Sequence, residues 1–338
     1  MQSYSLKKTT LPMTAAAFSF AVFTASASPV LYTDTGVSNT LIFRDYNGVS
    51  DTNVGYSPAP APSQSVSGGV STWNYANAIS DPKILYNDGG GTWDHVAYPW
   101  VRIRYQQSRT TGGGLTVWEQ NAAGGQGISL PTSSVFLEST GNPGNPSPTG
   151  AGFRIDPFGS SQVGDSVALD YVMIDRYETI GLGEWDRAGD VQGWATPNNN
   201  SVTVSNGVLS ATSTGDSQVT NGPGFDAGKY KFIEVRMKGA VGSAAQLFWA
   251  NNNGYTGTQR IDLGVNDSNF HTYLIDFSGE STWSGTNMNV RLDPVSGNNL
   301  TFEVDYIRAS TNALVPEPSS LALLAFGGLA LARRRRRI

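Results

Sequence analysis

The fold is decided by stretches in which apolar and polar residues alternate, such as Phe302-Glu303-Val304-Asp305-Tyr306-Ile307. Val101-Arg102-Ile103-Arg104-Tyr105 and Ile233-Glu234-Val235-Arg236-Met237 follow the same pattern. A period of two places every second side chain on one face of a β-strand, so one sheet face is buried and the other is wet. Clusters of Gly, Asn, Ser and Thr separate these stretches, and periodic helical stretches are absent from the body. The body of the chain is therefore predicted to be all-β.

The alternating stretches occur twice and in the same order. Five pairs carry this similarity: 66–70 with 204–208, 100–105 with 232–237, Val117-Trp118 with Phe248-Trp249, 153–157 with 290–294, and 170–172 with 305–307. Such order predicts an internal duplication. About 130 residues of short antiparallel strands in each copy fit a jelly-roll β-sandwich. We expect two tandem modules, at residues 30–178 and 182–310.

The N-terminus has the features of a secretory signal. Lys7 and Lys8 precede the apolar stretch 11–24, and Ala25-Ser26-Ala27 is a small-residue cleavage site. This order is typical of a signal peptide, here residues 1–27, that a signal peptidase removes.

The C-terminus, residues 313–338, has three parts. Pro316, Glu317 and Pro318 precede twelve apolar or glycine residues at 321–332. The chain then carries a cluster of arginines, which are Arg333, Arg334, Arg335, Arg336 and Arg337. Twelve residues span roughly 18 Å as a helix, less than the ~30 Å hydrocarbon core of a bilayer. Arginines beside an apolar segment mark its cytoplasmic side.

This tripartite tail resembles the PEP-CTERM sorting signal of Gram-negative bacteria. The resemblance implies recognition by an exosortase, cleavage near 316–318, and a transient inner-membrane helix. It also implies release or attachment at the cell surface in a host that makes exopolysaccharide. The alternative is a short tail anchor, which leaves the protein on the same side of the membrane.

Composition narrows the function further. The chain has no cysteine and two histidines, which excludes a disulfide scaffold and a thiolate metal site. Removing seven basic residues from 22 and one acidic residue from 27 with the two terminal signals leaves a net charge near −11. This charge argues against nucleic acid, whose phosphates need a basic surface. It also argues against bare anionic polysaccharide, unless a divalent cation bridges the two.

The second copy contains further motifs in a recognisable order. They include Glu184-Trp185-Asp186, Asp190-Val191-Gln192-Gly193-Trp194 and Arg291-Leu292-Asp293-Pro294. This order resembles the galactose-binding-like jelly-roll modules that accompany carbohydrate-active enzymes on bacterial surfaces. The resemblance implies a β-sandwich, sugar binding and often a structural calcium ion.

Sugar binding needs exposed aromatic rings, because pyranose rings stack their apolar C–H faces on them. The candidates in or beside predicted loops are Trp93, Trp118, Trp249, Tyr255 and Trp283. Polar and glycine residues flank Trp93 and Trp249 in particular. The alternative for each aromatic residue is a place in the sandwich core.

Calcium prefers several carboxylate and carbonyl oxygens. Glu184 and Asp186 near the first strand of the second copy could meet Asp305 on its last strand, which would form a structural calcium site. The alternative is that these acidic residues are solvated in turns. No other cofactor is expected.

The chain lacks an evident catalytic constellation. One β-jelly-roll glycosidase family carries two carboxylates in the pattern E-x-D-x-x-E, but here Glu303-Val304-Asp305-Tyr306-Ile307-Arg308 ends in arginine. We therefore predict a non-catalytic, exported protein of the cell surface or extracellular matrix that binds or organises polysaccharide. The alternatives are a purely structural matrix protein and a glycan-active enzyme.

Overall fold

The computed structural model describes residues 28–34, 36, 39–44, 46, 54–57, 59–86, 97–109, 111, 114–119, 127–142 and 153–313. All regular elements in this part of the chain are β-strands, which confirms the predicted fold class. No described segment is a helix with the length and hydrophobicity that a membrane span requires. The predicted signal peptide and the helix predicted at 321–332 lie outside the described residues.

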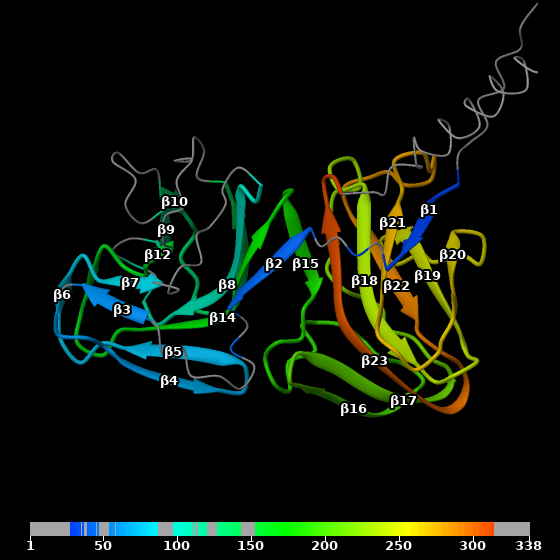
Figure 1. Ribbon diagram of the computed structural model, residues 1–338, viewed down its shortest axis with the longest axis horizontal. Helices are drawn as coiled ribbons and strands as arrows, with labels where there is room; N and C mark the ends of the chain where they lie inside the picture. Colours follow the sequence, from blue (N-terminus) through cyan, green and yellow to red (C-terminus); the bar gives the residue numbers. More distant parts are fainter. Residues whose placement is uncertain are drawn as a thin grey trace, which may run out of the picture.

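The strands form two units, each with its own core (Figure 1). The main sheet of the first unit has the order β11 (Leu137–Gly141), β8 (Trp100–Gln107), β14 (Ser166–Asp175), β5 (Val70–Asn74) and β4 (Ser63–Ser67), and β2 (Thr40–Arg44) also pairs with β14. The facing sheet has the order β10 (Gly127–Ser129), β9 (Thr116–Glu119), β12 (Phe153–Asp156), β7 (Lys83–Tyr86) and β3 (Val54–Ser57). A short pair, β13 (Ser160–Ser161) and β6 (Ile79–Ser80), completes the unit.

The main sheet of the second unit has the order β1 (Val30–Thr33), β21 (His271–Asp276), β18 (Phe232–Gly239), β23 (Ser296–Ser310), β17 (Val208–Asp216) and β16 (Asn199–Ser205), and β15 (Thr179–Gly183) also pairs with β23. Its facing sheet has the order β20 (Arg260–Val265), β19 (Ala244–Asn251) and β22 (Met288–Asp293).

The two main sheets share one strand order. It becomes visible when β11, β8, β14, β5 and β4 are matched in turn with β21, β18, β23, β17 and β16. β2 and β15 then occupy the same position beside the long central strand, and they lie between the two units in Figure 1. This match supports the predicted duplication, which stays a proposal.

Each core follows from the alternation in the strands. In the first unit, Trp73, Tyr105 and Leu169 point into the space between the two sheets and are fully buried. In the second, Trp185, Val235 and Ile307 are equally buried. Because buried aromatic and aliphatic side chains dominate the stability of a sandwich, each unit has an apolar core of its own.

One strand crosses between the units. The predicted first module, residues 30–178, includes β1. In the structure β1 pairs antiparallel with β21 of the second unit, and Val30 lies opposite Asp276. Asp276 lies opposite Phe232, and Phe232 lies opposite Ser310 at the end of β23. Ala313 and Tyr32 pack with Phe232. The first and last described residues therefore meet at one end of the second unit.

Candidate functional site

The outer face of each main sheet carries an arginine–aspartate ion pair at a β-bulge, and the two bulges lie at equivalent positions. Asp170 is the extra residue of a β-bulge in β14, and Arg104 on β8 donates to its carboxylate. Asp305 is the extra residue of the corresponding bulge in β23, and Arg236 on β18 donates to it. A bulge bends its strand and aims one side chain away from the regular alternation. The two pairs therefore mark equivalent places on the two sheets.

A groove lies beside this bulge in the first unit. Its volume is about 470 Å³, which falls within the ordinary size of small-molecule sites. It is lined by Ser67, Val70, Thr72, Gln106, Ser108, Phe136, Ser166, Ala168 and Arg187. These residues give hydroxyl and amide groups, one aromatic ring and one cation. Such a mixture suits a ligand that has both hydroxyl groups and apolar faces.

One wall of the groove comes from the second unit. The Arg187 guanidinium lies 4.7 Å from the centroid of the Phe136 ring, and the Arg104 guanidinium lies 5.3 Å from it. The backbone N–H of Ala188 donates to the carbonyl of Gly68, at 2.9 Å. This hydrogen bond fastens the segment after β15 to the β4–β5 turn.

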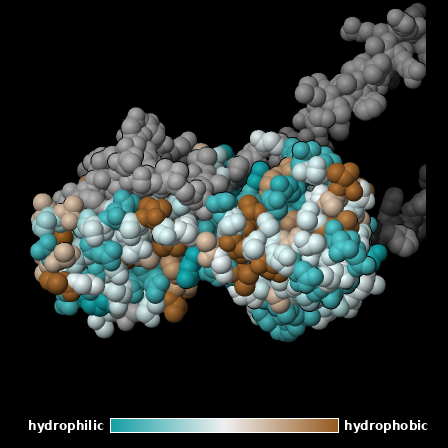
Figure 2. All heavy atoms as spheres, turned by 90° about the horizontal axis from the view of Figure 1, so that it is seen from below, coloured by the Kyte–Doolittle hydropathy of each residue, from teal (hydrophilic) through white to brown (hydrophobic). Residues whose placement is uncertain are grey.

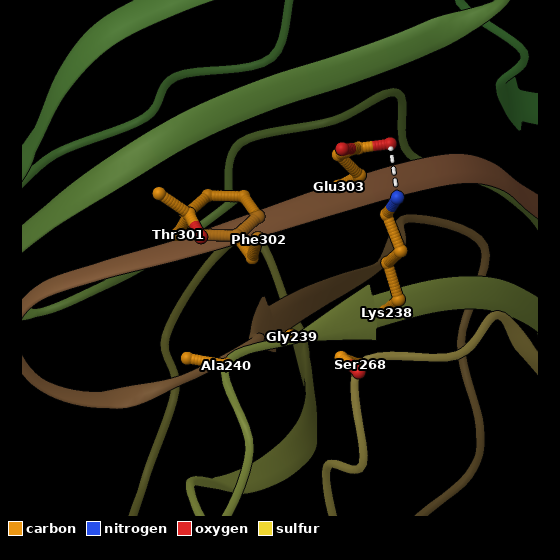
Figure 3. Close-up of a pocket in the computed structure, with 7 residues that line it drawn as sticks. All are labelled: Lys238, Gly239, Ala240, Ser268, Thr301, Phe302 and Glu303. Atoms are coloured by element: carbon orange, nitrogen blue, oxygen red, sulfur yellow. Dashed lines mark ion pairs between the residues drawn. The ribbon is translucent and has the colours of Figure 1, made fainter.

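The second unit has a smaller pocket on its outer face, of about 190 Å³. It is lined by Lys238, Gly239, Ala240, Ser268, Thr301, Phe302 and Glu303. Figure 3 shows Lys238 and Glu303 pointing toward each other from β18 and β23, and their charged atoms lie 3.1 Å apart. Phe270 lies beside them, with its ring centroid 4.8 Å from the Lys238 ammonium.

The strand registers show that the two hollows are equivalent. Gln106 lies opposite Ala168 in the first unit, and Lys238 lies opposite Glu303 at the corresponding place in the second. Phe136 and Phe270 directly precede β11 and β21, at matching positions in the two registers. Both outer faces thus combine one aromatic ring with polar side chains. Figure 2, seen from the side of β4, β5, β16 and β17, shows two lobes with mostly polar surfaces, and the largest hydrophobic patch in this view lies on the right-hand lobe beside the junction.

Two of the aromatic residues predicted to bind sugar lie in the core instead. Trp249 is 2% exposed and Trp283 is 3% exposed. Their indole N–H groups donate to Thr282 Oγ1 at 2.9 Å and to the carbonyl of Tyr230 at 2.8 Å. Trp283 stacks on Phe277 with ring centroids 3.8 Å apart. Both rings are covered by the core, so neither presents a face to a sugar, and this corrects the prediction.

Trp118 and Tyr255 lie apart from the two hollows. Trp118 on β9 is half-buried on the facing sheet, where the Arg154 guanidinium lies 5.4 Å from its ring centroid. Tyr255 is half-buried in the segment after β19, and its hydroxyl donates to Asn253 Oδ1 at 3.0 Å. Burial raises the pKa of Tyr255 to about 12. Trp93 lies outside the described residues.

The register also corrects one pairing of the proposed duplication. Trp118 lies opposite Arg154, and Phe248, rather than Trp249, lies opposite Arg291. The Arg291 guanidinium lies 4.5 Å from the Phe248 ring centroid, as Arg154 lies over Trp118. Trp249 therefore belongs to the opposite, inward face of its strand.

Two of the three acidic residues of the predicted calcium site, Glu184 and Asp305, form ion pairs instead. Glu184 is buried between the two units, where both of its oxygens accept hydrogen bonds of 2.7 Å from Arg308, and Arg102 also donates to it. Burial alone would raise the pKa of Glu184, but the two guanidiniums outweigh burial and lower the pKa. Arg102 also donates to Asp175 at 2.9 Å. A carboxylate held by two arginines binds the units together and has no oxygen left for a cation.

The other two residues of the predicted calcium site, Asp305 and Asp186, lie apart from Glu184 in their contacts. Asp305 pairs with Arg236, and Asp186 is buried beside the core. Within the described ranges, no group of three or more His, Asp or Glu side chains could hold a metal ion. β15 does lie against β23, so the expected meeting of the first and last strands of the second unit is observed. Calcium binding stays a prediction without support from these side chains.

Sequence reasoning missed the side chains that line the hollows. Alternation places Arg104 and Gln106 on one face of β8, and Arg236 and Lys238 on the same face of β18. This signal could have located the outer faces. Phe136 and Arg187 could not have been found this way, because they lie outside strands and meet only through the contact between the units.

Residues 314–337 match the model of the PEP-CTERM protein-sorting motif. This confirms the predicted tail, including Pro316, Glu317, Pro318 and Arg333–Arg337. The motif indicates export and exosortase-dependent sorting to the cell surface. A search of curated proteins finds no match.

Among solved structures, family 29 carbohydrate binding modules are similar to part of this chain. A mutant of such a module is 11% identical, with a TM-score of 0.32, and the match covers 42% of this chain and 98% of the module. A mutant complexed with mannohexaose is 12% identical, with a TM-score of 0.30, covering 40% and 92%. A module from Piromyces equi is 16% identical, with a TM-score of 0.29, covering 40% and 92%.

Proposed function

We propose that this exported protein binds polysaccharide at the cell surface or in the extracellular matrix, through the outer faces of its two units and without catalysis. The observation that carries the proposal is the equivalence of the two hollows. At the same register position, each unit presents an aromatic ring beside hydroxyl, amide or charged side chains.

The chemistry of the hollows supports a sugar ligand. A pyranose ring has an apolar C–H face that an aromatic ring can cover, and hydroxyl groups that side chains such as Gln106, Thr72 and Thr301 can bind. Ligand sites ordinarily combine apolar surface with a few oriented polar groups in this way. Two such places on one chain favour a repeating polymer, because linked sites bind more strongly together than each does alone.

The test is binding of the full chain to a panel of immobilised polysaccharides. Replacing both Phe136→Ala and Phe270→Ala is expected to abolish retention on the polysaccharide that the natural protein binds. Phe136→Leu and Phe270→Leu keep apolar volume without a ring and should also weaken binding, which separates stacking from folding.

Tyr255→Ala is the matched control, because Tyr255 is a half-buried aromatic residue outside both hollows. Retention that survives the double phenylalanine change and is lost with Tyr255→Ala would place the site elsewhere. Absence of binding to every polysaccharide in the panel would favour a purely structural surface protein. Release of shorter glycan products would instead establish an enzyme.

A further inference from the structure

Of the two hollows, only the first groove is lined by a single charged side chain, because the ion-pair partner of that side chain, Asp190, lies outside the lining. Arg187 is the one charged residue among the side chains that line the groove, and no acidic residue lines it. In the pocket of the second unit, Lys238 is compensated by Glu303 at 3.1 Å. The two equivalent sites therefore differ in the charge of the side chains that line them.

The donors of Arg187 are available. Its side chain is 44% exposed, and its guanidinium donates no hydrogen bond to any described residue. Its nearest carboxylate, Asp190, lies 3.6 Å away, and the oxygens of Asp190 already accept hydrogen bonds of 2.8 Å from Arg104 and from the backbone N–H of Gln192. Arg104 also pairs with Asp170, so this second guanidinium serves both local carboxylates.

The Arg187 side chain is also held in place. Its guanidinium lies 4.7 Å from the Phe136 ring centroid, and its backbone neighbour Ala188 donates to the carbonyl of Gly68. The guanidinium is a planar fork of N–H donors that matches the two oxygens of a carboxylate. Because Arg187 lies over the aromatic ring, its fork is held ready to bind one.

We propose that the first groove selects an acidic polysaccharide, and that Arg187, contributed by the second unit, binds the carboxylate of a uronic acid residue. This inference rests on the proposed function and names the substrate class of its first site. The overall charge near −11 argues against such a ligand at long range, but salt screens charges beyond about 8–10 Å. The affinity is then set by the Arg187 guanidinium, while the negative net charge slows the association of the protein with the polysaccharide.

The test compares two probes with the same backbone, polygalacturonate and its fully methyl-esterified form. The full chain is expected to bind the acid at least tenfold more tightly at about 0.15 M salt, where the distant negative charges are screened, and about 1 M salt should remove this preference. Arg187→Gln should reduce affinity for the acid about tenfold, which corresponds to about 1.4 kcal/mol, and should leave the ester unaffected. Arg187→Lys keeps the charge without the fork and should retain part of the preference.

Lys238→Gln is the matched control in the second pocket and should leave the preference for the acid unchanged. Equal affinity for acid and ester would overturn the assignment of Arg187 and leave glycan binding intact. An equal effect of Arg187→Gln on both probes would also overturn it, because the side chain would then act through the shape of the groove. Failure to bind either probe or any neutral polysaccharide would overturn the proposed function itself.

Discussion

The two units place the same arginine–aspartate pair in the same bulge, yet the surroundings differ. The Asp170 side chain is fully buried, whereas the Asp305 side chain is 27% exposed. The difference arises because the segment that follows β15 brings Arg187 and Asp190 over the first outer face. No described segment covers the second outer face in this way. A motif that two units share can therefore acquire different chemistry from the neighbour that packs on it.

The contact between the units is the interaction whose loss should have the largest effect. Glu184→Ala leaves the buried guanidiniums of Arg102 and Arg308 without their shared carboxylate. Removing one partner of a buried ion pair costs about 3–5 kcal/mol, and we expect a loss of this size in the free energy of unfolding. Denaturant unfolding of the full chain measures it.

Glu303→Ala provides the control for this comparison. It removes the carboxylate of the exposed Lys238–Glu303 pair on the other outer face. An exposed pair of this kind contributes about 0–1 kcal/mol. Equal losses for the two changes would show that burial of Glu184 between the units does not determine its contribution.

The second effect concerns the pH dependence of stability. Burial raises the pKa of Asp170 to about 6, although Arg104 opposes the shift. Because the folded state then holds this proton more tightly than the unfolded state, this carboxyl group makes stability fall as pH rises from about 4 to about 6. The full cost, about 3 kcal/mol, persists above that range. Asp170→Asn should remove this fall, as measured by unfolding at a series of pH values.

Asp305→Asn sharpens the same comparison. Burial also raises the pKa of Asp305, but its side chain is more exposed and Arg236 faces it. We expect its replacement to change the slope of stability against pH less than Asp170→Asn does. A larger change for Asp305→Asn would contradict the view that cover from the second unit distinguishes the two bulges.

The smallest effect is expected at the edge strand β1. His271 contacts Asp34, which follows β1, and Nε2 of His271 lies 2.9 Å from Asp267. The hydrogen bond with Asp34, and then that with Asp267, raises the pKa of His271. Its stabilising contribution is therefore present below pH ~6.5 and is lost as pH rises through the raised value.

Hydrogen exchange of the amides in β1 measures this contribution. After correction for intrinsic exchange rates, their protection should fall as pH rises above ~6.5, and His271→Gln should remove this dependence. The amides of β16, at the opposite edge of the same sheet, are the control and should not respond. A parallel response in β16 would assign the change to global unfolding.

The sequence was informative where local patterning decides structure. Alternation at Val101–Tyr105 and Ile233–Met237 identified central strands of both main sheets, because burial of one face requires a period of two. The tail was recognised because its order of Pro-Glu-Pro, apolar residues and arginines is contained in one short segment.

The sequence was misleading where distant contacts decide. Polar neighbours suggested an exposed Trp249, yet its strand turns that side chain toward Phe277. Glu184 was predicted to bind a cation together with Asp186 and Asp305. Its arginine partners were missed because Arg102 lies 82 positions away and Arg308 lies 124 positions away in the sequence. The four residues of β1 contain no signal for pairing with a strand about 240 positions later. Only the folded arrangement brings these groups together.

The meeting of the two described ends has a consequence for how the protein is displayed. Ser28 and Ala313 leave the second unit at the end where Val30, Phe232 and Ser310 are aligned across the sheet. Glu303 lies seven residues before Ser310 on β23, which places the pocket about 23 Å further along the strand. A tether at the sorting tail would therefore attach the second unit at the end of the sheet that lies away from the pocket.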